Sequence, residues 1–208
     1  MLLNGEQVFE ADARSGTCLA NTCANAAVLQ TKDDHIIFMA RGANVGECPG
    51  MMALPGGHAE PSVLGFYTQD IWQKESTRTT RPSSEQVVNV LWEAVLLEVE
   101  EETGVGRDQL GEPLLLGCAR RVENHRPVMC FLVQTILSAA EVLEIYHTTH
   151  VQDRFESTSL QSLPRLELLS HVFDVRGDAS ANHRFPGCHV GCLMLYRSYL
   201  RLLGLERP

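Results

Sequence analysis

The sequence predicts a mixed α/β fold, in which a β-sheet lies between helices that cover both of its faces. Apolar runs of strand length occur on both sides of a long amphipathic segment, and a second segment of helical period closes the chain. Because each apolar face has to be covered by another element, this order implies a layered α/β/α sandwich. The strand-like runs that carry the prediction lie at 24–30, 35–41, 113–121 and 128–137.

Composition and charge narrow the classes of function. The 208 residues carry a formal net charge of −9, with 44% hydrophobic and 21% charged residues, which is ordinary for one globular domain. A negative net charge argues against a nucleic-acid backbone or an anionic membrane as partner. No apolar run is long enough to span a bilayer, and the N-terminus has acidic residues where a signal peptide has positive ones. We therefore expect a cytoplasmic protein that acts on a small molecule, and its oligomeric state stays open.

The number and surroundings of the cysteines agree with the expected cytoplasmic location. The seven cysteines are odd in number and most of them lie in apolar stretches, so we expect reduced, buried thiols. Cys188 and Cys192 have helical i, i+4 spacing, but they lack the further His or Cys ligands that a structural zinc site needs.

The chain is expected to consist of an N-terminal lead-in at 1–22 and a single domain at 23–208. The runs at 24–30 and 35–41 are separated by four polar residues, a pattern that favours a β-hairpin. A short extended run then leads into Pro55-Gly56-Gly57, where paired glycines favour a tight turn that approaches a ligand closely.

A polar stretch at 62–83 is typical of an inserted surface loop. Ser83 or Ser84 then offers an N-cap for a helix of roughly five turns. The apolar positions of this helix lie near one stripe, which we expect to pack on the sheet, and Gly104 suits the left-handed position that ends it. Its expected apolar stripe consists of Val87, Val88, Leu91, Val95 and Val99.

After this helix, two strands are predicted around a turn at 123–127, and Ser138 is expected to cap a short helix. A further strand, a basic glycine-containing loop and the closing helix complete the chain. The expected bounds are 113–121 and 128–137 for the strands, 139–147 for the short helix, 155–163 for the last strand, 174–187 for the loop and 188–203 for the closing helix.

Acidic residues cluster at the end of the long helix. Glu98, Glu101 and Glu102 are spaced i, i+3, i+4, so they share one face of the helix and repel one another. A bound divalent cation such as Mg²⁺ removes this repulsion, because hard ions take carboxylate oxygens and share them with a phosphate substrate. An acidic run that merely forms a solvated helix face is the alternative, and the glutamates alone do not decide between the two.

Together, the glycine turn and the acidic helix end resemble the signature of the Nudix hydrolases, G-x5-E-x7-R-E-U-x-E-E-x-G-U, where U is a bulky apolar residue. Gly57 matches the leading glycine. The second half of the signature is matched in order by Glu98, Val99, Glu101, Glu102, Gly104 and Val105.

Two positions depart from the signature. Leu97 stands where the family has arginine, and Asn89 stands where it has the acid that pairs with that arginine. Losing both partners is less damaging than losing one, because only the single loss leaves an unpaired charge. The insertion at 62–83 is a further departure. Residues 55–61 (PGGHAEP) and 113–120 (PLLLGCAR), with that insertion and a helix lacking the arginine, resemble the mammalian UDP-glucose/UDP-galactose pyrophosphatase branch of the family.

The resemblance implies a Nudix-type α/β/α sandwich and hydrolysis of a nucleoside diphosphate linked to another moiety, dependent on Mg²⁺ or Mn²⁺. It implies that Glu98, Glu101 and Glu102 are catalytic and hold the metal together with the carbonyl of Gly57. Many members add an acidic residue from a later loop, for which Glu156 is favoured over Glu123 and Asp153.

Three further residues are candidates for substrate binding. Arg41 and Arg120 each stand at the end of a predicted strand, and His58 directly follows the glycines. Each has an alternative role, as a surface arginine or as a residue that only supports the loop. The favoured substrate is a UDP-sugar, cleaved to UMP and a sugar 1-phosphate. Another diphosphate, such as ADP-ribose or coenzyme A, is one alternative, and a degenerate domain that binds a nucleotide or protein without turnover is the other.

Overall fold

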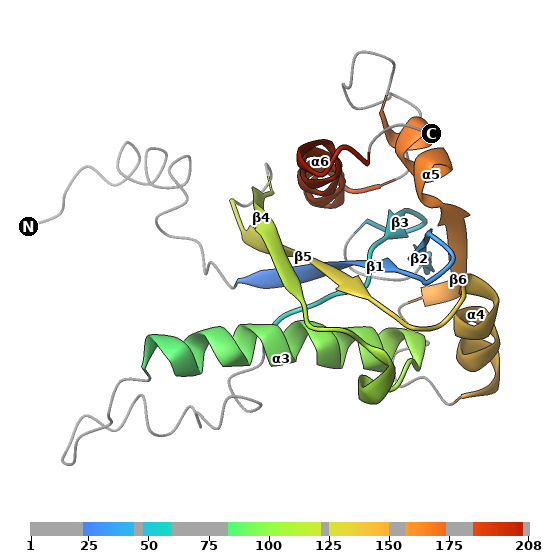
Figure 1. Cartoon of the computed structure of the whole chain (residues 1–208), viewed down its shortest axis with the longest axis horizontal. Coiled ribbons are helices and arrows are strands. Elements are labelled where there is room, and N and C mark those ends of the chain that lie inside the picture. Colours follow the sequence, from blue (N-terminus) through green and yellow to red (C-terminus); the bar gives the residue numbers. More distant parts are fainter. Residues whose placement is uncertain are drawn as a thin grey trace, which may run out of the picture.

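A computed structural model shows a six-stranded mixed sheet between two helical layers, with α3 and α4 on one face and α5 and α6 on the other (Figure 1). The structure describes residues 23–43, 48–59, 83–121, 125–149, 157–173 and 185–205. The predicted sandwich is therefore confirmed. In chain order, the elements are β1 (Ala24–Gln30), β2 (His35–Arg41), β3 (Met52–Ala53), α3 (Ser84–Thr103), η1 (Arg107–Gln109), β4 (Leu114–Arg120), β5 (Pro127–Gln134), α4 (Ala139–Thr148), β6 (Ser157–Pro164), α5 (Arg165–Val172) and α6 (Gly187–Leu202).

The sheet runs β3-β2-β1-β5-β4, with β6 on the other edge of β2. The predicted hairpin of β1 and β2 is present, but the two strands pair only next to their turn, at Leu29–Ile37 and Gln30–Ile36. Most of β1 pairs in parallel with β5, whereas β2 pairs along its whole length with β6. Long-range pairing therefore holds the centre of the sheet.

The space where β1 and β2 separate is filled by the segment that follows β2. β3 pairs with β2 at Met39–Ala53, and the chain then crosses to β1, where the Ala27 N–H donates to the Pro55 carbonyl at 2.7 Å. Because β6 occupies one edge of β2, β1 and β3 share the other edge. This crossing delivers the glycine turn to the side of the sheet that faces α3.

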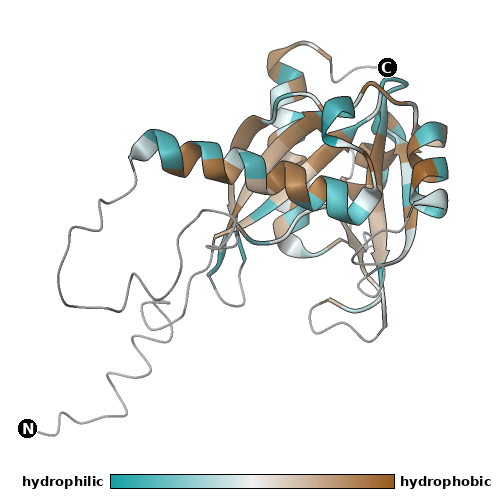
Figure 2. Cartoon of the chain, turned by 90° about the horizontal axis from the view of Figure 1, so that it is seen from below, coloured by the Kyte–Doolittle hydropathy of each residue, from teal (hydrophilic) through white to brown (hydrophobic). Residues whose placement is uncertain are grey.

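Alternation along the strands divides the core into two parts. On β1, Ala26 and Val28 pack toward α5 and α6, while Ala27 and Leu29 pack toward α3 and α4. The strands between the helices are coloured mainly as hydrophobic, whereas each helix alternates between hydrophilic and hydrophobic residues (Figure 2). This pattern is expected of a sheet that is covered on both faces.

The long helix begins and ends as expected. Ser83 is its N-cap and forms a capping box with Gln86, and Gly104 ends it at φ 78° with its N–H donating to Glu100. The expected stripe packs on the sheet only in the second half of the helix. Val87 and Val88 are 42% and 45% exposed, because the first turns of α3 extend past the sheet (Figure 1).

The cysteine prediction was wrong in two respects. Cys130 on β5 and Cys192 on α6 form a disulfide, and Cys118 is exposed. The pair is separated by 62 residues, so its closeness depends on the packing of α6 over β5. Cys188 is buried as a free thiol, and Cys192 forms its bond with β5 rather than joining Cys188 at a metal.

Other boundaries agree closely with prediction, and Ser138 caps α4 with a capping box. Two elements were not predicted: the 3₁₀ turn η1 and the short helix α5. The lead-in at 1–22, nearly all of the insertion at 62–83, and most of the 174–187 loop lie outside the described residues. Within the described part of the chain, no helix is long and apolar enough to cross a membrane.

Arg165, the first residue of α5, connects the β1–β2 turn to the segment that follows α6. Its Nε donates to both carboxylate oxygens of Asp34 at 2.8 and 3.0 Å, and its Nη1 donates to the Leu205 carbonyl at 2.8 Å. The Arg165 side chain is only 12% exposed, so this ion pair is better shielded from solvent than an ordinary surface pair.

We expect Arg165→Gln to lower the free energy of unfolding by about 1–3 kcal/mol, the range for charge-assisted hydrogen bonds. Arg107→Gln is a matched control, because Arg107 pairs with Glu93 at the surface and such pairs contribute about 0–1 kcal/mol. Urea denaturation of both variants measures the difference. Equal losses would show that Arg165 has no special role.

Candidate functional site

The candidate site is built on the turn that follows β3. The Gly57 carbonyl accepts from the Asn25 backbone N–H at 2.9 Å, and the Gly57 N–H donates to the Asn25 side-chain oxygen at 3.2 Å. His58 forms an isolated antiparallel bridge with Ala24. The turn is therefore fixed to the start of β1 by backbone and side-chain contacts.

Glycine is required at Gly56, whereas at Gly57 an added side chain would displace the Glu98 carboxylate. Gly56 has φ +149°, and a Cβ there would overlap the Asn25 carbonyl oxygen and come within 2.7 Å of the Ala26 Cα. A Cβ on Gly57 would overlap the Glu98 carboxylate. The paired glycines thus let β1, the turn and α3 meet closely.

Two of the predicted glutamates hold this turn. Glu98 Oε1 accepts from the His58 backbone N–H at 2.9 Å, and Glu102 Oε2 accepts from the Gly56 N–H at 2.7 Å. Glu102 is 6% exposed and Glu98 is partly buried. These contacts place Glu98 and Glu102 against the backbone of the turn rather than on a fully solvated helix face.

The residue types fit a hard divalent cation, because carboxylate and carbonyl oxygens are its preferred ligands. Glu101, also partly buried, lies on the same helix end as Glu98 and Glu102. Within the described ranges, however, no group of three or more His, Cys, Asp or Glu side chains is arranged to hold a metal ion. Glu98 and Glu102 instead each direct one oxygen to a backbone N–H of the turn.

Asn25 is a site residue that the sequence reasoning missed. It is 5% exposed and faces α3, and its side-chain Nδ2 is buried without a hydrogen-bond partner in the structure. An unpaired buried donor is costly, so such a group beside Gly57 is a candidate for ligand contact. A polar residue near the start of an otherwise apolar stretch, 24–29, was the available signal.

His58, a predicted substrate-binding residue, is exposed and lies 3.1 Å from Arg126, measured between Nε2 and Nη1. Because arginine only donates, Nε2 of His58 accepts this bond. Arg126 immediately precedes β5 and was not predicted as a site residue. Its position follows from the pairing of β5 with β1, which no local pattern indicates.

Among the described residues, the predicted arginines lie elsewhere. Arg120 is exposed at the end of β4, opposite Pro127. Arg41 instead lines a separate pocket beside α6, and Glu156 lies outside the described residues, as do Glu123 and Asp153. The structure thus brings Gly57, His58, Glu98 and Glu102 together. The described residues that line the Arg41 pocket are Arg41, Cys48, Arg121, Pro186, Cys188 and His189.

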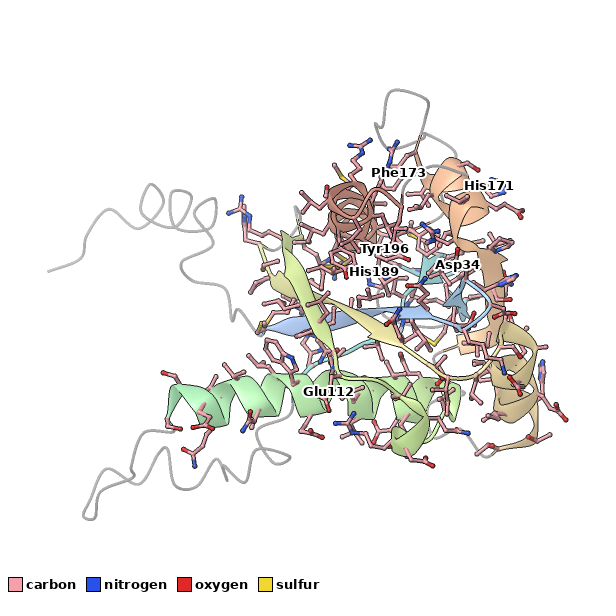
Figure 3. The ribbon with its side chains drawn as sticks, viewed as in Figure 1. Asp34, Glu112, His171, Phe173, His189 and Tyr196 are labelled. Atoms are coloured by element: carbon pink, nitrogen blue, oxygen red, sulfur yellow. A yellow bond between two sulfur atoms is a disulfide. The ribbon has the colours of Figure 1, made fainter. Side chains whose placement is uncertain are left out.

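His189 connects this second pocket to the segment that carries the glycine turn. It lies between α6 and the sheet, and its Nδ1 accepts from the Leu54 backbone N–H at 2.8 Å (Figure 3). Burial lowers the pKa of His189 to about 4, assisted by the guanidiniums of Arg41 and Arg121. The imidazole is therefore neutral at neutral pH.

Two curated proteins are similar to this chain over most of its length. The chain is 35% identical over 182 residues to Nudix hydrolase 9 of Arabidopsis thaliana, a match that covers 86% of this chain and 53% of that protein. The uridine diphosphate glucose pyrophosphatase NUDT22 of Bos taurus is 33% identical over 155 residues, covering 72% and 51%. The chain belongs to the Nudix family.

The remaining comparisons add little to this assignment. No family model matches the chain. The MutT protein of Methanosarcina mazei Go1 superposes with a TM-score of 0.49 at 16% identity, covering 86% of this chain and 94% of that one. The chain spans about half the length of the curated Nudix relatives it matches.

Gly56→Ala tests the close approach of β1 and the turn. We expect it to lower the stability by about 1–3 kcal/mol, because a non-glycine residue is strained at this φ and the added Cβ overlaps the β1 backbone. Gly187→Ala is the matched control, since a Cβ there meets nothing within 4 Å. Thermal unfolding of both variants provides the comparison, and equal stability would contradict the proposed packing.

His189 should make stability depend on pH. Its folded pKa of about 4 lies below the ordinary value of 6.5, so the unfolded chain binds the proton first as pH falls. Stability is therefore complete above pH 6.5 and is lost toward pH 4, by roughly 3 kcal/mol at most. Urea melts of the parent and of His189→Asn between pH 4 and 7 measure this loss. An equal loss of stability with falling pH in the parent and in His189→Asn would refute the role of His189.

Proposed function

We propose that this Nudix chain is a divalent-metal-dependent pyrophosphatase that hydrolyses a UDP-sugar. Water adds to one phosphorus, the bridging phosphorus–oxygen bond breaks, and UMP and a sugar 1-phosphate leave. The observation that carries the proposal is the contact of the Gly56–His58 turn with Glu98 and Glu102. Two relatives support it: one is named a Nudix hydrolase and the other a UDP-glucose pyrophosphatase.

Glu98, Glu101 and Glu102, with the Gly57 carbonyl, would hold Mg²⁺ or Mn²⁺. When bound, the ion neutralises pyrophosphate charge and lowers the pKa of water. The Gly57 carbonyl already accepts from Asn25, and a carbonyl oxygen has two lone pairs, so this bond is compatible with metal ligation. Glu98 and Glu102 would turn from the backbone N–H groups toward the ion.

The chain's own residues would position the diphosphate. Arg126 and His58 lie at the open side of the turn, where a cationic side chain offers charge-assisted hydrogen bonds to phosphate oxygens. Asn25 would donate its buried amide N–H to the bound substrate. Arg120 stays a prediction for the same role, as does Glu156 for metal binding.

Leu97 and Asn89 are the residues that favour a degenerate domain as the second candidate. Leu97 is partly buried and Asn89 is exposed. Both are uncharged, so replacing the family's ion pair leaves no lone charge at either position. The loss of the pair therefore does not by itself argue against catalysis. A nucleotide-binding domain without turnover remains the alternative that experiment has to exclude.

The decisive experiment incubates the protein with UDP-glucose, UDP-galactose, ADP-ribose or coenzyme A, in Mg²⁺ or in excess chelator, and separates products by chromatography. UMP and sugar 1-phosphate should form in equal amounts only with metal. Cleavage of ADP-ribose or coenzyme A alone would replace the proposed substrate, and no cleavage of any compound would favour the degenerate domain.

Glu98→Gln and Glu101→Gln should each lower turnover by about two to four orders of magnitude, the range for loss of a catalytic acid–base group. The rise in melting temperature on adding Mg²⁺ should also shrink, because ligand binding stabilises according to affinity. Glu93→Gln removes an exposed carboxylate from the same helix and should change neither quantity. An undiminished response to Mg²⁺ in Glu101→Gln would refute the metal mechanism.

A further inference from the structure

Asn25 holds the peptide group of Gly57 from two sides. Its backbone N–H donates to the Gly57 carbonyl at 2.9 Å, and its side-chain Oδ1 accepts from the Gly57 N–H at 3.2 Å. Because a backbone N–H can only donate, the oxygen of the carboxamide has to face Gly57, and the Nδ2 group lies on the other side of the carboxamide. The turn therefore fixes which end of the amide is left for a further contact.

That remaining end is a buried donor. Among the described residues the Nδ2 group of Asn25 has no acceptor, although the residue is only 5% exposed. The side chain lies on the same face of β1 as Ala27 and Leu29, which belong to the apolar core under α3 and α4. Leaving a buried donor unpaired destabilises the folded chain, and a ligand that brings the acceptor explains why such a residue is kept.

The position of Asn25 restricts what this acceptor is. Gly57, which Asn25 holds, lies directly against the Glu98 carboxylate, since a Cβ on Gly57 would overlap it. In the proposed function the Gly57 carbonyl and Glu98 hold the ion, and hard ions share their ligand shell with phosphate oxygens. Phosphate oxygens, rather than the base or the sugar, are therefore the substrate atoms expected beside Gly57.

We propose that Asn25 is a substrate-binding residue whose Nδ2 donates to a non-bridging oxygen of the bound diphosphate. The inference rests on the proposed function and adds to it a specificity-determining residue. Since the amide is fixed, Asn25 offers a donor and no acceptor at this point, so it selects a ligand that places an acceptor oxygen there. A bond from an amide to an anionic oxygen is charge-assisted and therefore stronger than an ordinary one.

Two variants separate donation to the ligand from support of the turn. Asn25→Asp keeps the shape of the side chain and an acceptor for the Gly57 N–H, but it replaces the donor by a carboxylate oxygen that repels phosphate. Asn25→Leu removes both the donor and the acceptor. If Asn25 donates to the diphosphate, Asn25→Asp should bind it more weakly than Asn25→Leu. If Asn25 only supports the turn, Asn25→Asp should bind as the parent does and Asn25→Leu should be the weaker.

The experiment measures affinity rather than turnover. Isothermal titration at saturating Mg²⁺ uses the analogue of UDP-glucose in which a methylene group replaces the oxygen between the two phosphorus atoms, so that this bridge is not cleaved. We expect Asn25→Leu to weaken binding of the analogue by roughly ten- to hundredfold, corresponding to one hydrogen bond to a charged group, and Asn25→Asp to weaken it further. Circular dichroism establishes that each variant folds.

Thr31→Val is the matched control. Thr31 follows the opposite end of β1, is 4% exposed, and donates its hydroxyl to Asp33 at 2.6 Å, so this variant also removes a buried polar group without approaching Gly57. Its affinity for the analogue should equal that of the parent, even where its stability is lower.

Melting curves with Mg²⁺ alone distinguish a contact with substrate from an effect on the ion. The bond that holds the Gly57 carbonyl comes from the backbone of Asn25, so Asn25→Leu should keep the parent's response to Mg²⁺. A response that falls as far as the affinity for the analogue would overturn the proposal, and so would binding of the analogue by Asn25→Asp as tightly as by the parent. Failure of the parent itself to bind the analogue would instead remove the proposed function, and this inference with it.

Discussion

The structure depends on the close contact between the start of β1, the Gly56–Gly57 turn and the end of α3. β1 and β2 separate after two residue pairs, and the turn enters the opening and takes over the hydrogen bonds of β1. Only glycine permits this approach at Gly56, because a Cβ there would overlap the backbone of β1, and a Cβ at Gly57 would displace the Glu98 carboxylate. Sheet formation and assembly of the acidic site are therefore one packing event.

The glutamates at this contact are held by backbone hydrogen bonds. Glu102 is buried, and a buried carboxylate needs hydrogen bonds to offset the loss of hydration. The Gly56 N–H supplies one, just as the His58 N–H does for Glu98. These bonds stabilise the turn, and binding of the proposed ion would exchange them for metal contacts.

Charged residues of different sign lie toward the two faces of the sheet. Glu98, Glu101 and Glu102 belong to α3 on one face. On the α6 face, burial keeps His189 neutral, and the guanidiniums of Arg41 and Arg121 assist. These three residues are distant in sequence, so only folding brings them together.

Local pattern was sufficient for most elements and for the acidic cluster. The caps at Ser83 and Ser138, the left-handed Gly104 and the i, i+3, i+4 glutamates are all properties of a few consecutive residues. The glycine turn was recognisable for the same reason. Local pattern did not provide the 3₁₀ turn η1 or the helix α5, whose three and eight residues are too few to show a clear helical period.

The sequence by itself determined the layered fold and the shared helix face of Glu98, Glu101 and Glu102, because strand and helix periodicities are properties of neighbouring residues. That Gly57 lies with these glutamates was implied by the resemblance to the Nudix family. Only the tertiary structure decided that Asn25 and Arg126 join this site, that Cys130 bonds Cys192, and that Arg41 lies in the pocket with His189 instead. Each of these depends on β1 pairing in parallel with β5, or on α6 packing over the sheet. Such contacts join residues far apart in sequence, so no periodicity or spacing within one segment specifies them.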